Sequence, residues 1–117
     1  MATIKRFEDI MTWQKAQDLA VDIYKQFADL KDYAFKDQIQ RAAVSISNNI
    51  AEGFDRNTNK EFARFLYIAK ASAAEVKSML YLAERLDYLN STMCGQLRHR
   101  ADEISKMIGG LIRSISS

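Results

Sequence analysis

The chain has 117 residues, of which 48% are hydrophobic and 27% charged, with a formal net charge of +2. This composition is typical of one globular domain, long enough to bury a core without disulfide or metal crosslinks. The single cysteine, Cys94, excludes an intrachain disulfide, and the small basic surplus does not identify a nucleic-acid-binding protein by itself. Charges occupy the place of a signal-peptide core, and no apolar run approaches membrane-spanning length, so we expect a cytoplasmic protein.

Apolar residues recur at three- and four-residue steps along most of the chain, and the chain contains no proline to break a helix. A short N-terminal arm, residues 1–11, precedes the first repeat. The helices that we predict cover residues 12–30, 33–52, 58–88 and 91–117. Because their connections are short, consecutive helices must fold back on one another. The sequence therefore predicts a single all-α domain, an antiparallel up-down-up-down four-helix bundle.

The second predicted helix ends in a turn that carries several polar residues. Gly53 follows the last apolar repeat, where a glycine can adopt the left-handed conformation that closes a helix, and Thr58 can cap the next helix. Asn49, Glu52 and Arg56 surround this turn. We interpret them as a structural network that organises the turn. The alternative is a catalytic site, which would require a concave pocket at the turn with a perturbed carboxylate.

The third predicted helix carries more apolar surface than a core seam requires. A heptad seam begins at Phe62. A second apolar flank lies beside it and consists of Phe65, Ile68, Met79, Leu82 and Leu86. A lone bundle has no use for this flank, so we interpret it as a contact between subunits. The alternative is that a central helix simply has a broad apolar face.

The last predicted helix holds the basic surplus, because residues 91–117 contain four basic and two acidic side chains. Asp102 and Lys106 have the spacing of an ion pair within one helix. The basic residues form either a solvated face or a phosphate-binding strip. Gly109 and Gly110 weaken this helix, so we expect it to fray there, unless a neighbouring backbone approaches closely.

The residues that usually carry chemistry do not form a recognisable site. His99, the single histidine, lies between two arginines, which favours a surface side chain over a metal ligand. Cys94 lies near the apolar seam and is interpreted as a buried filler rather than a nucleophile. The sequence has no phosphate-binding glycine loop, paired-cysteine zinc motif or serine nucleophile elbow. We therefore expect no catalytic residues, no metal and no cofactor.

Three motifs follow one another in the order F-E-D-I-x-x-W-Q-K-A (residues 7–16), Q-x-x-R-A-A-x-S-I-x-x-N-I-A-E-G-x-x-R (residues 38–56) and E-F-x-x-F-L-x-x-A-x-x-S-x-x-E (residues 61–75). The chain thereby resembles the four-helix-bundle family of 23S rRNA intervening-sequence proteins, which carry a ribosomal-type name. The resemblance implies a homo-oligomeric ring, expected to be a pentamer. A relative of that family is the accessory variability protein of diversity-generating retroelements, a basic barrel that partners reverse transcriptase and nucleic acid.

A ring of five copies would carry a formal charge of five times +2, or +10, which is enough to attract polyanions. The leading hypothesis is a non-enzymatic homo-oligomeric adaptor that binds RNA, DNA or a nucleic-acid-processing protein. The residues expected to contact phosphate are Arg98, Arg100, Lys106 and Arg113, with Arg41 and Arg56 as a second group. The alternatives are a protein-binding or structural module without nucleic-acid binding, and an enzyme with a site near Asn49, Glu52 and Arg56.

Overall fold

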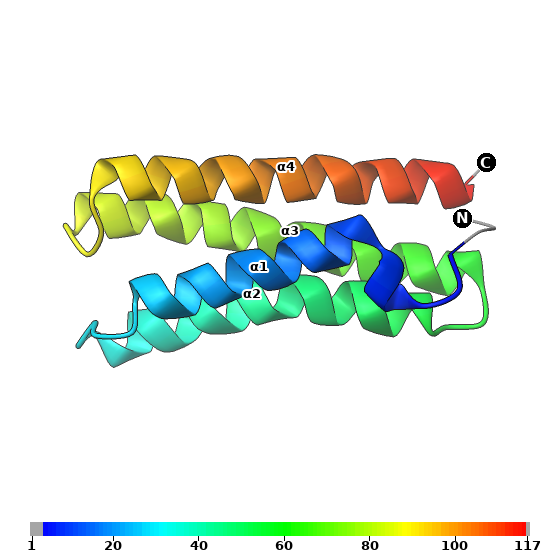
Figure 1. Ribbon diagram of the computed structural model, residues 1–117, viewed down its shortest axis with the longest axis horizontal. Coiled ribbons are helices and arrows are strands. Elements are labelled where there is room, and N and C mark those ends of the chain that lie inside the picture. Colours follow the sequence, from blue (N-terminus) through cyan, green and yellow to red (C-terminus); the bar gives the residue numbers. More distant parts are fainter. Residues whose placement is uncertain (1–3, 117) are drawn as a thin grey trace.

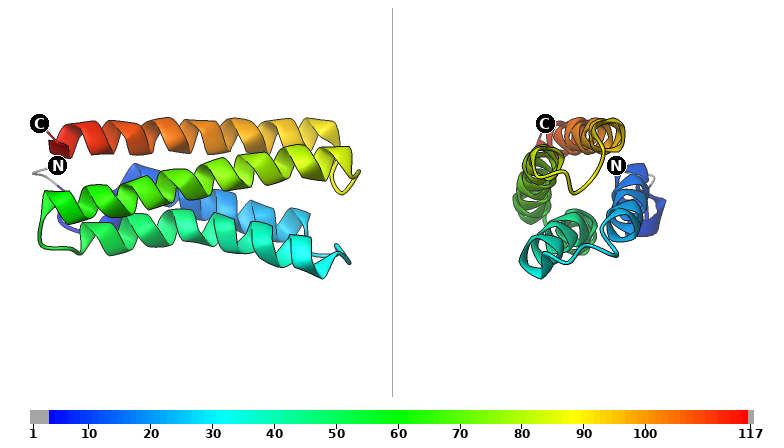
Figure 2. Two further views of the ribbon diagram at one scale, coloured as in Figure 1. Left: turned by 180° about the vertical axis from the view of Figure 1, so that it is seen from behind. Right: turned by 90° about the vertical axis from the view of Figure 1, so that its left-hand side faces the viewer.

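The computed structural model describes residues 4–116, and this part of the chain is a four-helix bundle without β-strands. The elements are η1 (Phe7–Asp9), α1 (Met11–Gln26), α2 (Tyr33–Phe54), α3 (Asn59–Arg85) and α4 (Ser91–Ser116). Figure 1 shows that the chain reverses direction at each connection between helices. The end-on view in Figure 2 shows the helices around a common axis, in a rod that measures 44 × 20 × 20 Å. The predicted all-α four-helix bundle is therefore confirmed.

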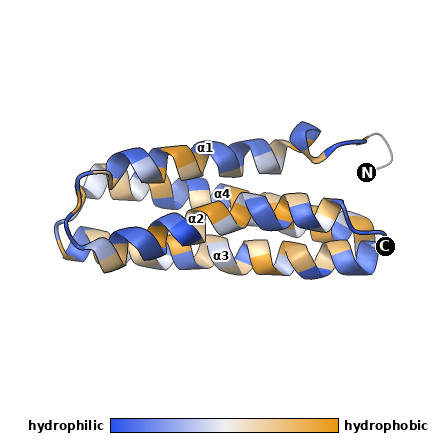
Figure 3. Cartoon of the chain, turned by 90° about the horizontal axis from the view of Figure 1, so that it is seen from below, coloured by the Kyte–Doolittle hydropathy of each residue, from blue (hydrophilic) through white to orange (hydrophobic). Residues whose placement is uncertain are grey.

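The apolar repeats form the core. In Figure 3 hydrophilic and hydrophobic residues alternate along each helix, which is the pattern of amphipathic helices. The predicted seam of α3 is buried throughout, and its members are Phe62, Leu66, Ala69, Ala73, Val76, Leu80 and Ala83. α3 packs against both α2 and α4, and α1 completes the bundle against the same two helices. No helix in residues 4–116 is long and apolar enough to cross a membrane.

Side chains cap the starts of α3, as predicted for Thr58, and of α4. The Thr58 hydroxyl accepts a hydrogen bond from the Glu61 backbone N–H at 3.2 Å, and the Asn90 side chain accepts one from the Met93 N–H at 2.8 Å. These side chains satisfy backbone donors that have no partner inside the helix. Of the predicted N-terminal arm, residues 1–3 lie outside the described part, and Phe7–Asp9 forms a short 3-10 turn.

The predicted end of the third helix at residue 88 is wrong, because α3 ends at Arg85. Asp87 adopts a positive φ of 57°. The Tyr88 N–H then donates to the Ala83 carbonyl at 2.9 Å, and the Asp87 N–H donates to the Glu84 carbonyl at 3.1 Å. This pair of bonds is the Schellman motif, which satisfies carbonyl groups at a helix end. Asp87 therefore adopts the left-handed conformation that ends α3.

The predicted left-handed closure at Gly53 is also wrong. Gly53 is buried inside α2, which continues to Phe54, and no glycine in the described residues has a positive φ. A Cβ atom on Gly53 would lie 2.7 Å from the Cβ of Phe65 and 3.0 Å from a ring carbon of Phe62. Gly53 is required because α2 and α3 approach each other too closely at this point for a side chain.

Candidate functional site

Charged side chains meet across the line of contact between α3 and α4, which we call the α3/α4 seam. Arg98 donates to Glu84 at 2.7 Å, and its guanidinium lies 4.2 Å from the centre of the Tyr81 ring. Farther along, the Lys77 ammonium lies 2.9 Å from the Asp102 carboxylate, which raises the pKa of Lys77. Each of these pairs joins one helix to the other and neutralises its two charges.

The predicted pair between Asp102 and Lys106 within one helix is wrong. Asp102 instead forms an ion pair with Lys77 of α3, across the seam. Lys106 consequently has no carboxylate within ion-pair distance among residues 4–116. Because Asp102 pairs with Lys77, Lys106 is left without the carboxylate that the sequence pattern predicted for it.

The next step along the seam brings Lys70 opposite Gly109. Glu84, Lys77 and Lys70 are spaced at seven-residue steps on α3, so they point in nearly the same direction. The first two have charged partners on α4, whereas the third meets a residue without a side chain. A Cβ atom on Gly109 would lie 3.9 Å from Lys70 Nζ and 3.4 Å from Arg113 Nη1. Two cationic groups thus lie over the bare backbone of Gly109.

These cations line a concavity of about 190 Å³, whose residues are Lys70, Ser105, Lys106, Gly109 and Arg113. We refer to Lys70, Lys106 and Arg113 as the free-cation cluster, because none of them forms an ion pair in the described part of the chain. Three neighbouring positive charges without counter-charges, beside the Ser105 hydroxyl, match the chemistry that binds phosphate. α4 runs helically through Gly109 and Gly110 to Ser116, so the predicted fraying is wrong.

The free-cation cluster contains two of the residues expected to contact phosphate, Lys106 and Arg113, and adds Lys70. Sequence reasoning missed Lys70 because it lies on a different helix from the basic surplus. The signal that could have found it is its seven-residue spacing from Lys77, combined with a glycine at the facing position of the next helix. By contrast, Arg98 is paired with Glu84, and Arg100 donates to Asp22 of α1 at 2.6 Å. These two arginines are already engaged by carboxylates.

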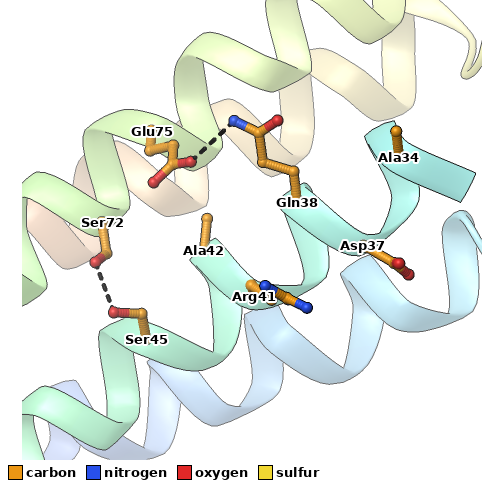
Figure 4. A pocket seen from close by; sticks show the side chains of 8 residues that line it. All are labelled: Ala34, Asp37, Gln38, Arg41, Ala42, Ser45, Ser72 and Glu75. Carbon is orange, nitrogen blue, oxygen red and sulfur yellow. Dashed lines mark hydrogen bonds between the residues drawn. The ribbon is translucent and has the colours of Figure 1, made fainter.

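The second group of expected phosphate contacts lies elsewhere. Arg41 belongs to an open groove of about 520 Å³ between α2 and α3 (Figure 4), lined by Ala34, Asp37, Gln38, Arg41, Ala42, Ser45, Ser72 and Glu75. Hydroxyls of Ser45 and Ser72 are 2.9 Å apart, and the Gln38 amide donates to Glu75 at 3.3 Å. Figure 4 shows Arg41 and Asp37 turned away from α3. With two carboxylates and one guanidinium, this groove does not favour an anion.

The predicted network at the turn after α2 is not formed. The Asn49 amide donates back to the Ser45 carbonyl at 2.8 Å, within its own helix. The Arg56 guanidinium lies 4.7 Å from the centre of the Phe65 ring, and the ion pairs of residues 4–116 include none between Arg56 and Glu52. The physical reason is that α2 ends at Phe54, so Arg56 lies beyond the helix that carries Glu52, and its guanidinium packs on the Phe65 ring instead. An open concavity of about 360 Å³ includes Asn49 and Glu52 but not Arg56.

The residues expected at a subunit interface divide into two groups. Phe65 and Met79 are buried within the protomer, with 8% and 7% of their surface exposed. Ile68, Leu82 and Leu86 are exposed at 40%, 46% and 45%. Since α3 packs between α2 and α4, part of its second apolar flank already belongs to the core. Of this flank, only Ile68, Leu82 and Leu86 therefore remain available to another molecule.

Cys94 and His99, the remaining candidates for catalysis or metal binding, do not belong to the free-cation cluster. Cys94 is fully buried, its thiol points to the Leu89 carbonyl at 3.6 Å, and burial raises its pKa. A buried neutral thiol of this kind is a core residue. His99 is exposed on α4. Within the described residues, no group of three or more His, Cys, Asp or Glu side chains is arranged to hold a metal ion.

Fold and site together define a four-helix-bundle protein with a cationic concavity between its last two helices. Residues 8–110 match the family described as 23S rRNA-intervening sequence protein, and the chain belongs to this family. The structure is similar to the crystal structure of a protein with unknown function from the S23 ribosomal protein family of Bacteroides thetaiotaomicron. The two share 28% identity with a TM-score of 0.81, over 86% of this chain and 97% of the other. No curated protein matches the sequence.

Proposed function

We propose that this protein is a non-enzymatic, homo-oligomeric adaptor that acts in the cytoplasm and binds RNA or DNA through the free-cation cluster, without a cofactor. The observation that carries the proposal is the set of three unpaired cations, Lys70, Lys106 and Arg113, that line a concavity at Gly109, a residue without a side chain. Elsewhere on the same seam, arginine and lysine are held by carboxylates. A phosphodiester would supply the negative charge that this part of the seam lacks.

Assembly would convert a weak local site into a strong one. In this proposal, antiparallel up-and-down bundles associate as a ring, expected to be a pentamer, through the exposed apolar residues Ile68 and Leu82 of α3 and Leu86 just after it. Each copy then contributes one free-cation cluster. Because linked sites bind the same strand at a high effective concentration, five weak phosphate contacts would combine into stable retention.

The test is charge reversal at the cluster, measured as retention of a labelled RNA or DNA oligonucleotide at low salt. The double variant Lys106→Glu with Arg113→Glu should lose at least tenfold in affinity, because it replaces attraction by repulsion. The matched control, Lys25→Glu with Lys60→Glu, changes the net charge equally at exposed residues away from the cluster and should bind nearly as the wild type does.

Salt dependence separates phosphate contact from other modes of binding. Wild-type affinity should fall steeply with added salt, and the cluster variant should show a shallower slope, since it releases fewer counterions. Absence of binding by the wild-type protein at low salt would overturn the proposal, as would an equal loss in the cluster variant and the control variant.

The alternative is a protein-binding module that does not contact nucleic acid. It is favoured by the groove of about 520 Å³ between α2 and α3, which borders the exposed residues of α3 and contains both signs of charge (Figure 4). Capture of a protein partner that depends on Arg41 and Glu75, with no nucleic-acid retention, would support this alternative.

A further inference from the structure

An exposed aromatic ring lies beside the free-cation cluster. Tyr67 precedes Lys70 by three residues on α3, so the two side chains are neighbours on the helix surface. Tyr67 is 59% exposed, and the aromatic and cation contacts found in residues 4–116 do not include its ring. Tyr81, farther along α3, is covered by the Arg98 guanidinium. Only Tyr67 of these two offers both an open ring and nearby unpaired cations.

We infer that the free-cation cluster and Tyr67 together form a binding site for single-stranded nucleic acid, in which the cluster binds backbone phosphate and Tyr67 stacks on a base. The inference rests on the proposed function and specifies its ligand. A duplex presents phosphates but keeps its base faces stacked inside, so it could use the cations but not the ring. A single strand can use both.

The geometry around Gly109 explains how one phosphate can be held. Lys70 Nζ and Arg113 Nη1 lie 3.9 Å and 3.4 Å from the position that a Cβ atom would take on Gly109. The two nitrogens are therefore no farther apart than the sum of these distances, and one phosphate can contact both. Gly109 is buried and contributes no side chain, so no carboxylate meets Lys70 here, whereas Asp102 contributes a carboxylate that pairs with Lys77.

The site can be closed without removing any cation. Gly109→Asp should place a carboxylate between Lys70 and Arg113, as Asp102 does for Lys77, and should weaken binding of a labelled oligouridylate by at least tenfold. Gly109→Asn has nearly the same size without the charge and should keep most of the affinity. Both variants replace a helical glycine by a residue with higher helix propensity, so neither is expected to unfold the bundle.

The role of the ring is tested with fluorescence anisotropy of labelled oligouridylate, oligothymidylate and a duplex of oligouridylate with oligoadenylate. Tyr67→Ala should lower affinity for both single strands about fivefold to a hundredfold, the usual range for one stacked base, and leave duplex binding nearly unchanged. Tyr67→Phe keeps the ring and should restore binding. Tyr33→Ala is the matched control, because Tyr33 is 62% exposed on α2 and lies outside the cluster.

The outcomes distinguish this inference from the proposed function. If the duplex binds as tightly as the single strands, or if Tyr67→Ala binds as the wild type does, the single-strand inference is wrong while the adaptor proposal stands. If no probe binds at low salt, the proposed function itself fails. Similar affinity for the uridylate and thymidylate strands is expected, because stacking and phosphate contact do not read the ribose 2′-hydroxyl; loss of binding to the thymidylate strand alone would contradict the inference.

Discussion

A glycine of this protein is helical where a left-handed conformation is expected, and an aspartate is left-handed where a helix is expected. Gly53, which follows an apolar repeat and precedes a turn, is helical and buried. Asp87, which lies where a helix was expected to continue, has a positive φ of 57°. A short polar side chain tolerates the left-handed region, so aspartate can end a helix. Glycine, in turn, is needed at Gly53 because two helices approach there too closely for a side chain. The conformational freedom of glycine and its small size are therefore separate reasons for its presence.

The first prediction concerns Gly53. Gly53→Ala should lower the free energy of unfolding by about 1–3 kcal/mol, because its Cβ would lie 2.7 Å from the Cβ of Phe65 and force α2 and α3 apart. Urea denaturation measures this change. The control is Gly110→Ala, whose Cβ would lie 3.9 Å from the end of the flexible Arg113 side chain. It should stabilise the protein by about 0.5–1 kcal/mol through helix propensity. Equal effects of the two substitutions would contradict the packing argument.

At the scale of elements, hydrogen bonds between connections hold one end of the bundle together. Asp32 accepts a hydrogen bond from the Phe35 N–H at 3.1 Å, which caps α2, and one from the Tyr88 hydroxyl at 2.7 Å. Tyr88 also packs edge-on against the Phe35 ring, with centroids 5.2 Å apart. The segment after α3 is thereby tied to the start of α2. The hydrogen bond from Tyr88, and then that from Phe35, lowers the pKa of Asp32 below 3.8.

A prediction on pH follows from this contact. Because the pKa of Asp32 is lower in the folded state, the ionised form contributes stability above about pH 4, and this contribution is lost as the pH falls through the lowered pKa. Tyr88→Phe should raise the pKa of Asp32 toward 3.8, as measured by NMR titration of its carboxyl carbon. Tyr88→Phe should also destabilise the protein less at acid pH than at neutral pH, because protonated Asp32 no longer benefits from the hydrogen bond that the variant lacks. An unchanged Asp32 pKa would show that Tyr88 does not influence this carboxylate.

At the scale of the whole molecule, the free-cation cluster and the exposed apolar residues lie on different sides of α3. The free-cation cluster faces α4, whereas Glu75 lies on the side of α2, in the groove shown in Figure 4. Ile68 and Leu82 are exposed and lie seven residues before and after Glu75, so they share its side of the helix, and Leu86 is exposed just after the end of α3. In the proposed ring, α3 would therefore serve both assembly and phosphate contact, with separate residues for each task.

The assembly prediction is tested by multi-angle light scattering of the purified protein. A pentamer would have a mass of five times 13.4 kDa, or 67 kDa. The double variant Leu82→Glu with Leu86→Glu should dissociate it, because two carboxylates would have to be buried against apolar surface. Met11→Glu is the control, since Met11 is a 60% exposed apolar residue at the start of α1. A wild-type protein that scatters as a monomer would refute the ring, and with it the repeated display of the cluster.

The sequence by itself determined the class of fold, the seam of α3 and the cap at Thr58. These features depend on spacing within about one or two helical turns, which a single helix already encodes. It also identified Lys106 and Arg113 as candidates, because both belong to the basic surplus of the last helix. The burial of Phe65 and Met79, which we had assigned to a subunit contact, could not be read from one helix alone.

Only the tertiary structure decided which cations are free. Arg98, Lys77 and Lys70 resemble one another in the sequence, yet the first two meet carboxylates and the third meets Gly109. That difference depends on the register between α3 and α4, which is set by the end of α3 at Arg85, the turn at Asp87 and the packing of the two helices. Pairing across a seam is a property of two helices together, and no pattern within either helix contains it.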